Sequence, residues 1–221
     1  MAISPRVANE SVRKPDRVAG ALAAGFVVIL LATEAVLTLP DETANPRTVA
    51  SFYATHRAFI ILQLLGVVAA ALLGGYAWRL RSVDRVGSAA GMIMAGCGLI
   101  PSLITLVIAI VADPSDPSAA GRWNALEPRG DDILFVGIVL FAGTVAVRLG
   151  RKLPALGLLA LFVAVSCLIR LGLEIGGNNR GPLDAIGPLS FVLLIAVMAI
   201  LSFLGLLRSP PDATPGDDHE R

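Results

Sequence analysis

Long apolar stretches, separated by short polar ones, run through most of the chain. Six of them meet the length that an α-helix needs to cross about 30 Å of hydrocarbon, the fourth only just. They cover residues 18–39, 59–78, 87–112, 133–147, 154–173 and 186–207. Proline, glycine or charged residues separate them, which is typical of the ends of elements. The pattern predicts an all-α fold, a polytopic transmembrane bundle of six helices.

The first and fourth stretches differ from the other four. Residues 18–39 follow a basic start and resemble a signal peptide, but 22 residues are longer than a cleaved apolar region, so we expect a retained helix. Residues 133–147 offer only 15 uninterrupted apolar positions. We therefore expect the charged groups of Asp131, Asp132 and Arg148 to extend from its ends toward the membrane surfaces.

Basic residues indicate the orientation, because short cytoplasmic loops carry an excess of Arg and Lys. Four lie before the first stretch, three in residues 79–85 and three in residues 148–152. These positions fall on one side of a six-helix path, which predicts that both termini are cytoplasmic. The connections at residues 41–57, 113–132 and 174–184 are then expected to face outward.

The chain accordingly divides into three parts. Residues 1–17 form a basic cytoplasmic tail, residues 18–208 the six-helix transmembrane domain, and residues 209–221 a second cytoplasmic tail. The second tail is polar and rich in proline, so we expect it to be disordered.

Composition supports a membrane location. Hydrophobic residues make up 55% of the chain and charged residues 16%, and the mean hydropathy is +0.75, which leaves too little polar surface for a soluble domain. A net charge of +1 with no basic stripe makes nucleic acid an improbable partner. Arginine greatly outnumbers lysine, as in proteins of GC-rich bacteria, so we expect a multipass protein of the bacterial inner membrane.

Small residues suggest how the helices pack, because helices in lipid approach closely only where side chains are small. They gather in the second and third apolar stretches, which we therefore expect at the centre of the bundle. They are Ala69, Ala70, Ala71, Gly74, Gly75, Gly87, Gly91, Gly96 and Gly98. Pro101 in the third stretch removes a backbone donor and predicts a kink that shapes a cavity.

Three ionisable residues fall inside or at the edge of the spans: Glu34, Arg170 and Glu174. Such groups are costly in hydrocarbon, so each is a candidate site residue. The i,i+4 spacing places Arg170 and Glu174 on one helix face, and Glu34 can reach Arg170 if the first and fifth helices are neighbours. The alternative is structural: Arg170 snorkels toward the surface and Glu174 simply begins a loop.

Further polar residues lie near the same predicted level. We consider His56, Asp113 and Asp132, together with Gln63 one turn inside the second helix, as candidates for ligand binding. They would line a polar outer vestibule above an apolar cavity floored by the first, second, third and fifth helices. The alternative for the loop charges is an ordinary wet surface, and for Gln63 a hydrogen bond between helices.

Several classes of site lack the residues they need. The chain has two histidines, one of them in the second tail, which does not support a bis-histidine haem, a histidine-rich metal site or a zinc protease. It also lacks a Walker A motif and a dinucleotide fingerprint. We therefore predict no cofactor and no metal.

The order of motifs resembles that of the uncharacterised small multipass membrane proteins of bacteria. The likeness covers residues 18–207 and consists of a short basic turn after the second helix, in GYAWRLRSVDRVGSAAG, and an R-K-x-P motif before the fifth, in GRKLPALGLLALFVAVSCLIRL. This resemblance implies a fold class, and it transfers no catalytic residue.

Three functions fit the sequence. The first is binding or movement of a lipophilic or small amphipathic ligand in an outward-facing cavity. The second is a membrane-embedded enzyme in which Glu34 or Glu174 acts as a general acid, as buried carboxyl groups do in membrane terpene cyclases. The third is an accessory or structural subunit whose glycine and alanine faces pack on another membrane protein or a second copy.

Overall fold

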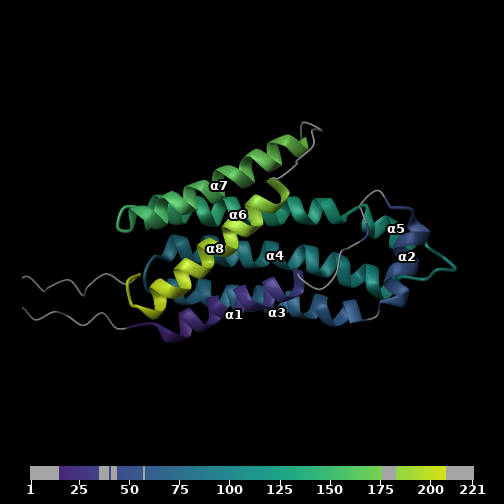
Figure 1. The fold of residues 1–221 in the computed structure, drawn as a ribbon, viewed down its shortest axis with the longest axis horizontal. Coiled ribbons are helices and arrows are strands. Elements are labelled where there is room, and N and C mark those ends of the chain that lie inside the picture. Colours follow the sequence, from purple (N-terminus) through teal and green to yellow (C-terminus); the bar gives the residue numbers. More distant parts are fainter. Residues whose placement is uncertain (1–14, 35–39, 41–43, 57, 176–182, 208–221) are drawn as a thin grey trace, which may run out of the picture.

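The computed structural model describes residues 15–34, 40, 44–56, 58–175 and 183–207, and these contain eight α-helices and no strand. The helices are α1 (Arg17–Glu34), α2 (Pro46–Thr55), α3 (Ala58–Leu80), α4 (Arg85–Val111), α5 (Ser118–Asn124), α6 (Glu127–Arg148), α7 (Pro154–Ile175) and α8 (Leu183–Phe203), shown in Figure 1. The all-α prediction is confirmed for this part of the chain.

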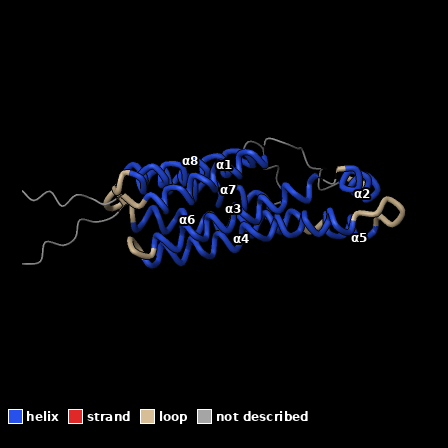
Figure 2. Tube along the Cα trace, turned by 90° about the horizontal axis from the view of Figure 1, so that it is seen from below, coloured by secondary structure: helices blue, strands red, loops and turns tan. Residues whose placement is uncertain are grey.

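The six long helices form a closed ring. α1 packs on α3, α3 on α4, α4 on α6, α6 on α7 and α7 on α8, and α8 returns to α1. Both the start of α1 and the end of α8 lie at the end of the bundle that carries the α3–α4 and α6–α7 turns (Figure 1), here called the terminal end. The short helices α2 and α5 lie together at the opposite, capped end (Figure 2).

Aromatic side chains fill the middle of this ring. The ring centroid of Phe191 in α8 lies 6.2 Å from that of Phe26 in α1 and 6.4 Å from that of Phe141 in α6, both in edge-to-face contact. Such pairs add about 0.5–1.5 kcal/mol to the effect of burial itself. The three side chains are buried, so a packed core occupies the ring at this level.

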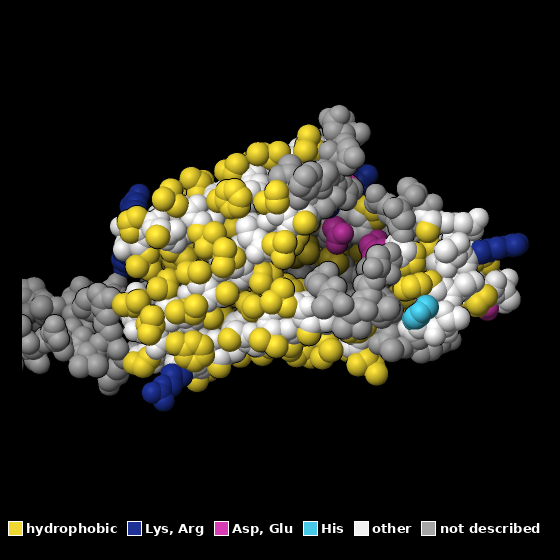
Figure 3. Space-filling view, viewed as in Figure 1, with side chains coloured by type: hydrophobic (Ala, Val, Ile, Leu, Met, Phe, Trp, Pro, Cys, Tyr) yellow, Lys and Arg dark blue, Asp and Glu magenta, His cyan; other side chains and the backbone are white. Residues whose placement is uncertain are grey.

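The outer face of the ring is apolar. Large side chains such as Val28, Ile61 and Leu158 are 65–69% exposed (Figure 3), an arrangement that water penalises and hydrocarbon does not. Five helical segments are long and apolar enough to cross a membrane: Ile60–Leu80, Arg85–Val111, Ser118–Arg148, Pro154–Glu174 and Ala185–Phe203. A shorter apolar helix covers Arg17–Thr33. These helices define a multipass membrane protein.

The fourth predicted span is longer than its apolar stretch. α6 begins at Glu127, so Asp131 and Asp132 lie within the helix instead of at its end. Gly130 allows α6 to approach α4 closely here, because a Cβ at this glycine would lie 3.4 Å from the Cα of Pro101. The additional turns give the helix its crossing length and carry two carboxyl groups along it.

The expectation that the second and third spans lie at the centre is wrong. They correspond to α3 and α4. In the apolar part of each of these helices 28% of the residues are buried, against 39–44% in the other three long spans. Their small residues serve the contact between these two helices: a Cβ at Gly91 would lie 2.7 Å from the Cβ of Ala77. In a ring each helix has two principal neighbours, and close pairing does not make either helix central.

Two of the predicted outward connections contain the short helices α2 and α5. The side chain of Asn45 accepts a hydrogen bond from the amide of Arg47 and so caps α2, which places Pro46 in its first turn. Val49 and Tyr53 of α2 pack with Ile108 near the end of α4, forming a small core separate from that of the ring. The capped end is thus an ordered structure.

Two ion pairs join neighbouring helices at the terminal end. Arg79 Nη2 lies 2.9 Å from Asp16 Oδ2, and Arg148 Nη2 lies 3.0 Å from Asp84 Oδ1. Asp84 also accepts a hydrogen bond of 2.8 Å from the amide of Gly87, so it is the N-cap of α4. Burial alone would raise the pKa of Asp84, but the hydrogen bonds from Arg148 and from the backbone hold that pKa below its ordinary value.

The lowered pKa of Asp84 predicts that the stability of the protein depends on pH. Because its pKa is lowered in the folded protein, the stabilisation is complete above the unfolded-state pKa, roughly 4, and is lost as the pH falls through the folded-state pKa. Asp84→Ala removes the cap and the ion pair and should cost about 0.5–2 kcal/mol at pH 7. Asp84→Asn, which keeps a capping oxygen, should cost less.

Unfolding titrations of the three proteins in mild detergent, repeated between neutral and acidic pH, measure this effect. The difference between wild type and Asp84→Asn should shrink on acidification. A difference that stays constant down to strongly acidic pH would show that the carboxylate charge has no part in stability.

Candidate functional site

The most deeply buried charged side chain among the described residues is that of Arg170, which is 2% exposed and lies in the second half of α7. Its Nη1 donates a hydrogen bond of 3.0 Å to Asp132 Oδ1 and lies 3.6 Å from Glu174 Oε2. The aromatic ring of Phe135 covers the guanidinium, with a Cζ-to-centroid distance of 3.8 Å. We call Arg170, Asp132, Glu174 and Phe135 the arginine cluster.

Helical spacing builds the cluster from two helices. Asp132 and Phe135 are three residues apart in α6, and Arg170 and Glu174 are four apart in α7, so each pair lies on one face of its helix. Asp132 presents its carboxylate to the guanidinium at the position where α6 extends beyond its apolar stretch. The long α6 and the buried arginine are therefore parts of one arrangement.

A glycine in α8 lets a third helix cover the cluster. A Cβ at Gly187 would lie 3.1 Å from the Sγ of Cys167 and 3.1 Å from Cε1 of Phe135. Both distances are tighter than ordinary van der Waals contact, so a larger residue would push α8 away. This role is difficult to predict from the sequence, because Gly187 lies beside Pro188 and the two residues are also typical of the start of a helix.

The cluster joins one guanidinium to two carboxylates. The guanidinium is enclosed, whereas the side chains of Asp132 and Glu174 keep 20% and 16% of their exposure. The two acids thus separate the arginine from the surface.

A hollow opens on this side of the molecule. Figure 3 shows acidic side chains within it, with apolar side chains next to them. Asp131, Asp132 and Glu174 are all partly accessible and lie on the α6 and α7 segments of this region. An apolar recess with a few convergent polar groups is the usual form of a small-molecule site.

The structure brings together three of the seven predicted site residues: Arg170, Glu174 and Asp132. Glu34 is the last residue of α1, and its side chain lies outside the described residues. The condition for Glu34 to reach Arg170 was that the first and fifth helices are neighbours; α1 and α7 are not principal neighbours, because α8 packs on both of them. Phe135 and Gly187 were missed, since an apolar residue and a glycine carry no distinguishing signal in an apolar sequence.

The remaining candidates lie apart from the cluster. His56 ends α2, where its ring stacks on Phe52 at 4.5 Å and its Nδ1 lies 2.8 Å from the Phe52 carbonyl oxygen. Asp113 is exposed and accepts hydrogen bonds from the hydroxyl and amide of Ser115, which lower the pKa of Asp113. Gln63 is half-buried near the start of α3.

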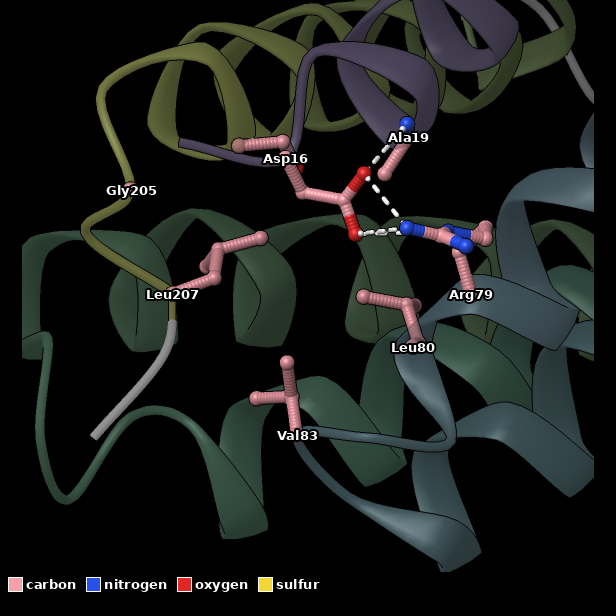
Figure 4. Close-up of a pocket in the computed structure, with 8 residues that line it drawn as sticks. Asp16, Ala19, Arg79, Leu80, Val83, Gly205 and Leu207 are labelled. Atoms are coloured by element: carbon pink, nitrogen blue, oxygen red, sulfur yellow. Dashed lines mark hydrogen bonds and ion pairs between the residues drawn. The ribbon is translucent and has the colours of Figure 1, made fainter. Parts of the chain in front are cut away.

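A small cavity at the terminal end is of a different kind. It has a volume of about 10 Å³, and Figure 4 shows Asp16, Arg79, Leu80 and Leu207 around it. Asp16 accepts hydrogen bonds from the Ala19 amide and from Arg79, and its own amide donates to the Ser202 carbonyl. These bonds fasten the start of α1 to α3 and α8, and the space is no larger than a water molecule needs.

Fold and cluster together define a multipass helical membrane protein with a buried arginine held by two acids. No family model, no curated protein and no solved structure matches the chain.

Removing the arginine should destabilise the bundle strongly. Arg170→Met leaves the carboxylates of Asp132 and Glu174 without the charge that compensates them, and breaking a buried ion pair in this way costs about 3–5 kcal/mol. Unfolding in mixed micelles with sodium dodecyl sulfate measures the loss. Arg151→Met, at an exposed position in the α6–α7 turn, is the matched control and should change little.

A triple variant separates the loss of charge from the loss of packing. Changing Arg170 to Met together with Asp132 and Glu174 to Leu removes every charge of the cluster, and it should recover much of the stability. Equal stability of Arg170→Met and Arg151→Met would contradict a structural role for the ion pairs.

Proposed function

We propose that the chain is a six-span protein of the bacterial inner membrane that binds or moves a small amphipathic or lipophilic ligand in the hollow at the capped end. The terminal end carries the basic turns, including Arg79, Arg81, Arg148 and Arg151. The positive-inside rule favours a cytoplasmic location for this end and for both termini. The capped end, with the hollow, then faces outward.

The observation that carries the binding proposal is the arginine cluster beside an apolar hollow. Holding an arginine in an apolar bundle is costly, and such residues in membrane spans generally face a pathway or a cavity. Arg170 has two carboxylates within 3.6 Å of its Nη1, and both acids keep partial exposure. That accessible carboxylate surface beside the hollow supports a binding role.

The enzymatic alternative has less support. A general acid must carry a proton, whereas Glu174 faces the guanidinium of Arg170 as an ion-pair partner. The accessory-subunit alternative rests on Gly96 of α4 and Gly143 of α6. A Cβ added at either glycine would have no neighbouring atom within 4 Å among the described residues. Such positions favour close approach of another helix, from a second copy or a partner.

Cysteine labelling tests the orientation. In a background with Cys97 and Cys167 changed to alanine, Ser115→Cys at the capped end should react with an impermeant maleimide in intact cells. Ser82→Cys in the α3–α4 turn should react only after the membrane is permeabilised. The reverse pattern would place the hollow on the cytoplasmic side.

Mass spectrometry of organic extracts from the purified protein tests the binding. We expect a defined compound to accompany the wild type, and its amount to fall about tenfold in Asp132→Asn, which removes one charged hydrogen bond of the cluster. Asp116→Asn is the control, because Asp116 is an exposed acid whose carboxylate accepts hydrogen bonds from Ser118. Identical extracts from all three proteins, with bulk lipid alone, would refute ligand binding.

A further inference from the structure

The terminal end of the bundle carries an excess of positive charge. Seven basic and two acidic side chains lie in its described residues, which cover 15–20, 76–90, 145–156 and 200–207. Figure 3 shows basic side chains projecting from this end. Residues 1–14 and 208–221 continue the chain from here and carry five basic and five acidic side chains, so their composition leaves the excess unchanged.

Two of these basic residues differ from the others in their surroundings. Arg79 and Arg148 bind the two acids of this end in the ion pairs that join neighbouring helices. Arg81 and Arg85 flank the α3–α4 turn and are both exposed. Neither forms an ion pair with an acid in the described part of the chain. The turn thus presents two guanidinium groups that the bundle itself does not use.

An exposed tryptophan lies beside this turn. Trp78 belongs to the last turn of α3 and is 58% exposed. The guanidinium of Arg81 covers its ring, with a Cζ-to-centroid distance of 5.2 Å, which is close enough for a cation–π interaction. Tryptophan is enriched where membrane helices meet the lipid head groups, because its ring is amphipathic. The pair therefore places a guanidinium at the depth of the head groups.

The outer faces of α3 and α4 are apolar from this level toward the middle of the bundle. On α3 the exposed residues Leu64, Ala71 and Trp78 are spaced by seven positions, so they lie along one face. On α4 the exposed Met92 follows Arg85 at the same spacing. Because α3 and α4 are neighbours in the ring, their exposed faces both point to its outside. Acyl chains fit against these faces while a head group reaches the two arginines.

We propose that the α3–α4 turn is a docking site for an anionic phospholipid, whose phosphate binds Arg81 and Arg85 and whose acyl chains lie along the exposed faces of α3 and α4. This site is separate from the hollow at the capped end and does not depend on the proposed function. Guanidinium groups bind phosphate oxygens through charged and often bidentate hydrogen bonds. The ammonium group of a zwitterionic lipid would lie near the same two cations and be repelled, which favours a head group of net negative charge.

A phosphate ion from water fits this surface less well. Both arginines are exposed, so an ion that gains only their charge is weakened by salt, which screens such interactions over about 10 Å. A phospholipid is already held at the right depth by its acyl chains. Each basic side chain near the surface of a membrane then favours an anionic lipid by about fivefold.

Quenching of Trp78 fluorescence by brominated lipids tests the proposal. The chain has two tryptophans, so Trp123→Phe leaves Trp78 as the only one. The full chain is reconstituted in vesicles of phosphatidylglycerol and phosphatidylcholine in equal parts, with one lipid or the other brominated near the head group. We expect brominated phosphatidylglycerol to quench more strongly, with a preference of at least about fivefold. The ratio between the two lipids is unaffected by changes in the intrinsic fluorescence.

Substitutions at the turn assign the preference to its two arginines. Arg81→Gln combined with Arg85→Gln should abolish the preference, and Arg81→Lys combined with Arg85→Lys should keep most of it. Two controls come from the capped end. Arg122→Gln, at an exposed position of α5, should leave the preference at Trp78 unchanged. Trp78→Phe leaves Trp123 as the only tryptophan, and the two lipids should quench it about equally.

Each contrary result overturns a definite part of the proposal. Equal quenching of Trp78 by the two brominated lipids would show that no anionic lipid docks at the turn. A preference that survives the paired glutamine substitutions, or that appears equally at Trp123, would show that Arg81 and Arg85 do not form the site. Loss of the preference when inorganic phosphate replaces chloride at equal ionic strength would identify the soluble ion, instead of a lipid, as the occupant.

Discussion

The burial of one guanidinium constrains much of this bundle. Arg170 is 2% exposed inside an apolar assembly, so its charge must be met by carboxylates placed within a few ångströms. Asp132 meets it from α6, which requires that helix to continue beyond its apolar stretch. Glu174 meets it from one turn further along α7. The pairing of α6 with α7 is thus fixed by charge at the capped end as well as by apolar packing.

The same constraint explains the path of α8. A helix that covers the arginine cluster must come close to Phe135, and Gly187 removes the side chain that would prevent it. The other end of α8 is held to α1 by Phe203 against Gly20 and by the hydrogen bond from the Asp16 amide to the Ser202 carbonyl. Because these two attachments lie on different neighbours, α8 runs obliquely, and the ring is closed more tightly at the terminal end.

The sequence predicted the elements well and their neighbours poorly, for a physical reason. Apolar runs define spans because hydrocarbon excludes unpaired backbone groups, so five of the expected spans appear as long apolar helices. Which helices touch depends on shape, and Gly91 against Ala77 gives a close pair without making α3 and α4 central. α2 was detectable from Asn45, Pro46 and the spacing of Val49 and Tyr53, but a search for spans ignores so short a helix.

Only part of the candidate site could be predicted from the sequence, for a related reason. Arg170 and Glu174 stand out because charges are rare in apolar runs, and their spacing shows that they share a face. Asp132 lies at the edge of a run and was predicted as a ligand-binding residue of the outer vestibule, but its contact with the arginine was not predicted; it accepts a hydrogen bond of 3.0 Å from Arg170. Asp132 and Glu174 both keep partial exposure, so the ion pairs that join α6 to α7 also leave carboxylate surface open to a ligand. Charge in an apolar sequence therefore marks the residues of the site, whereas the partner of each charge is set by how the helices pack.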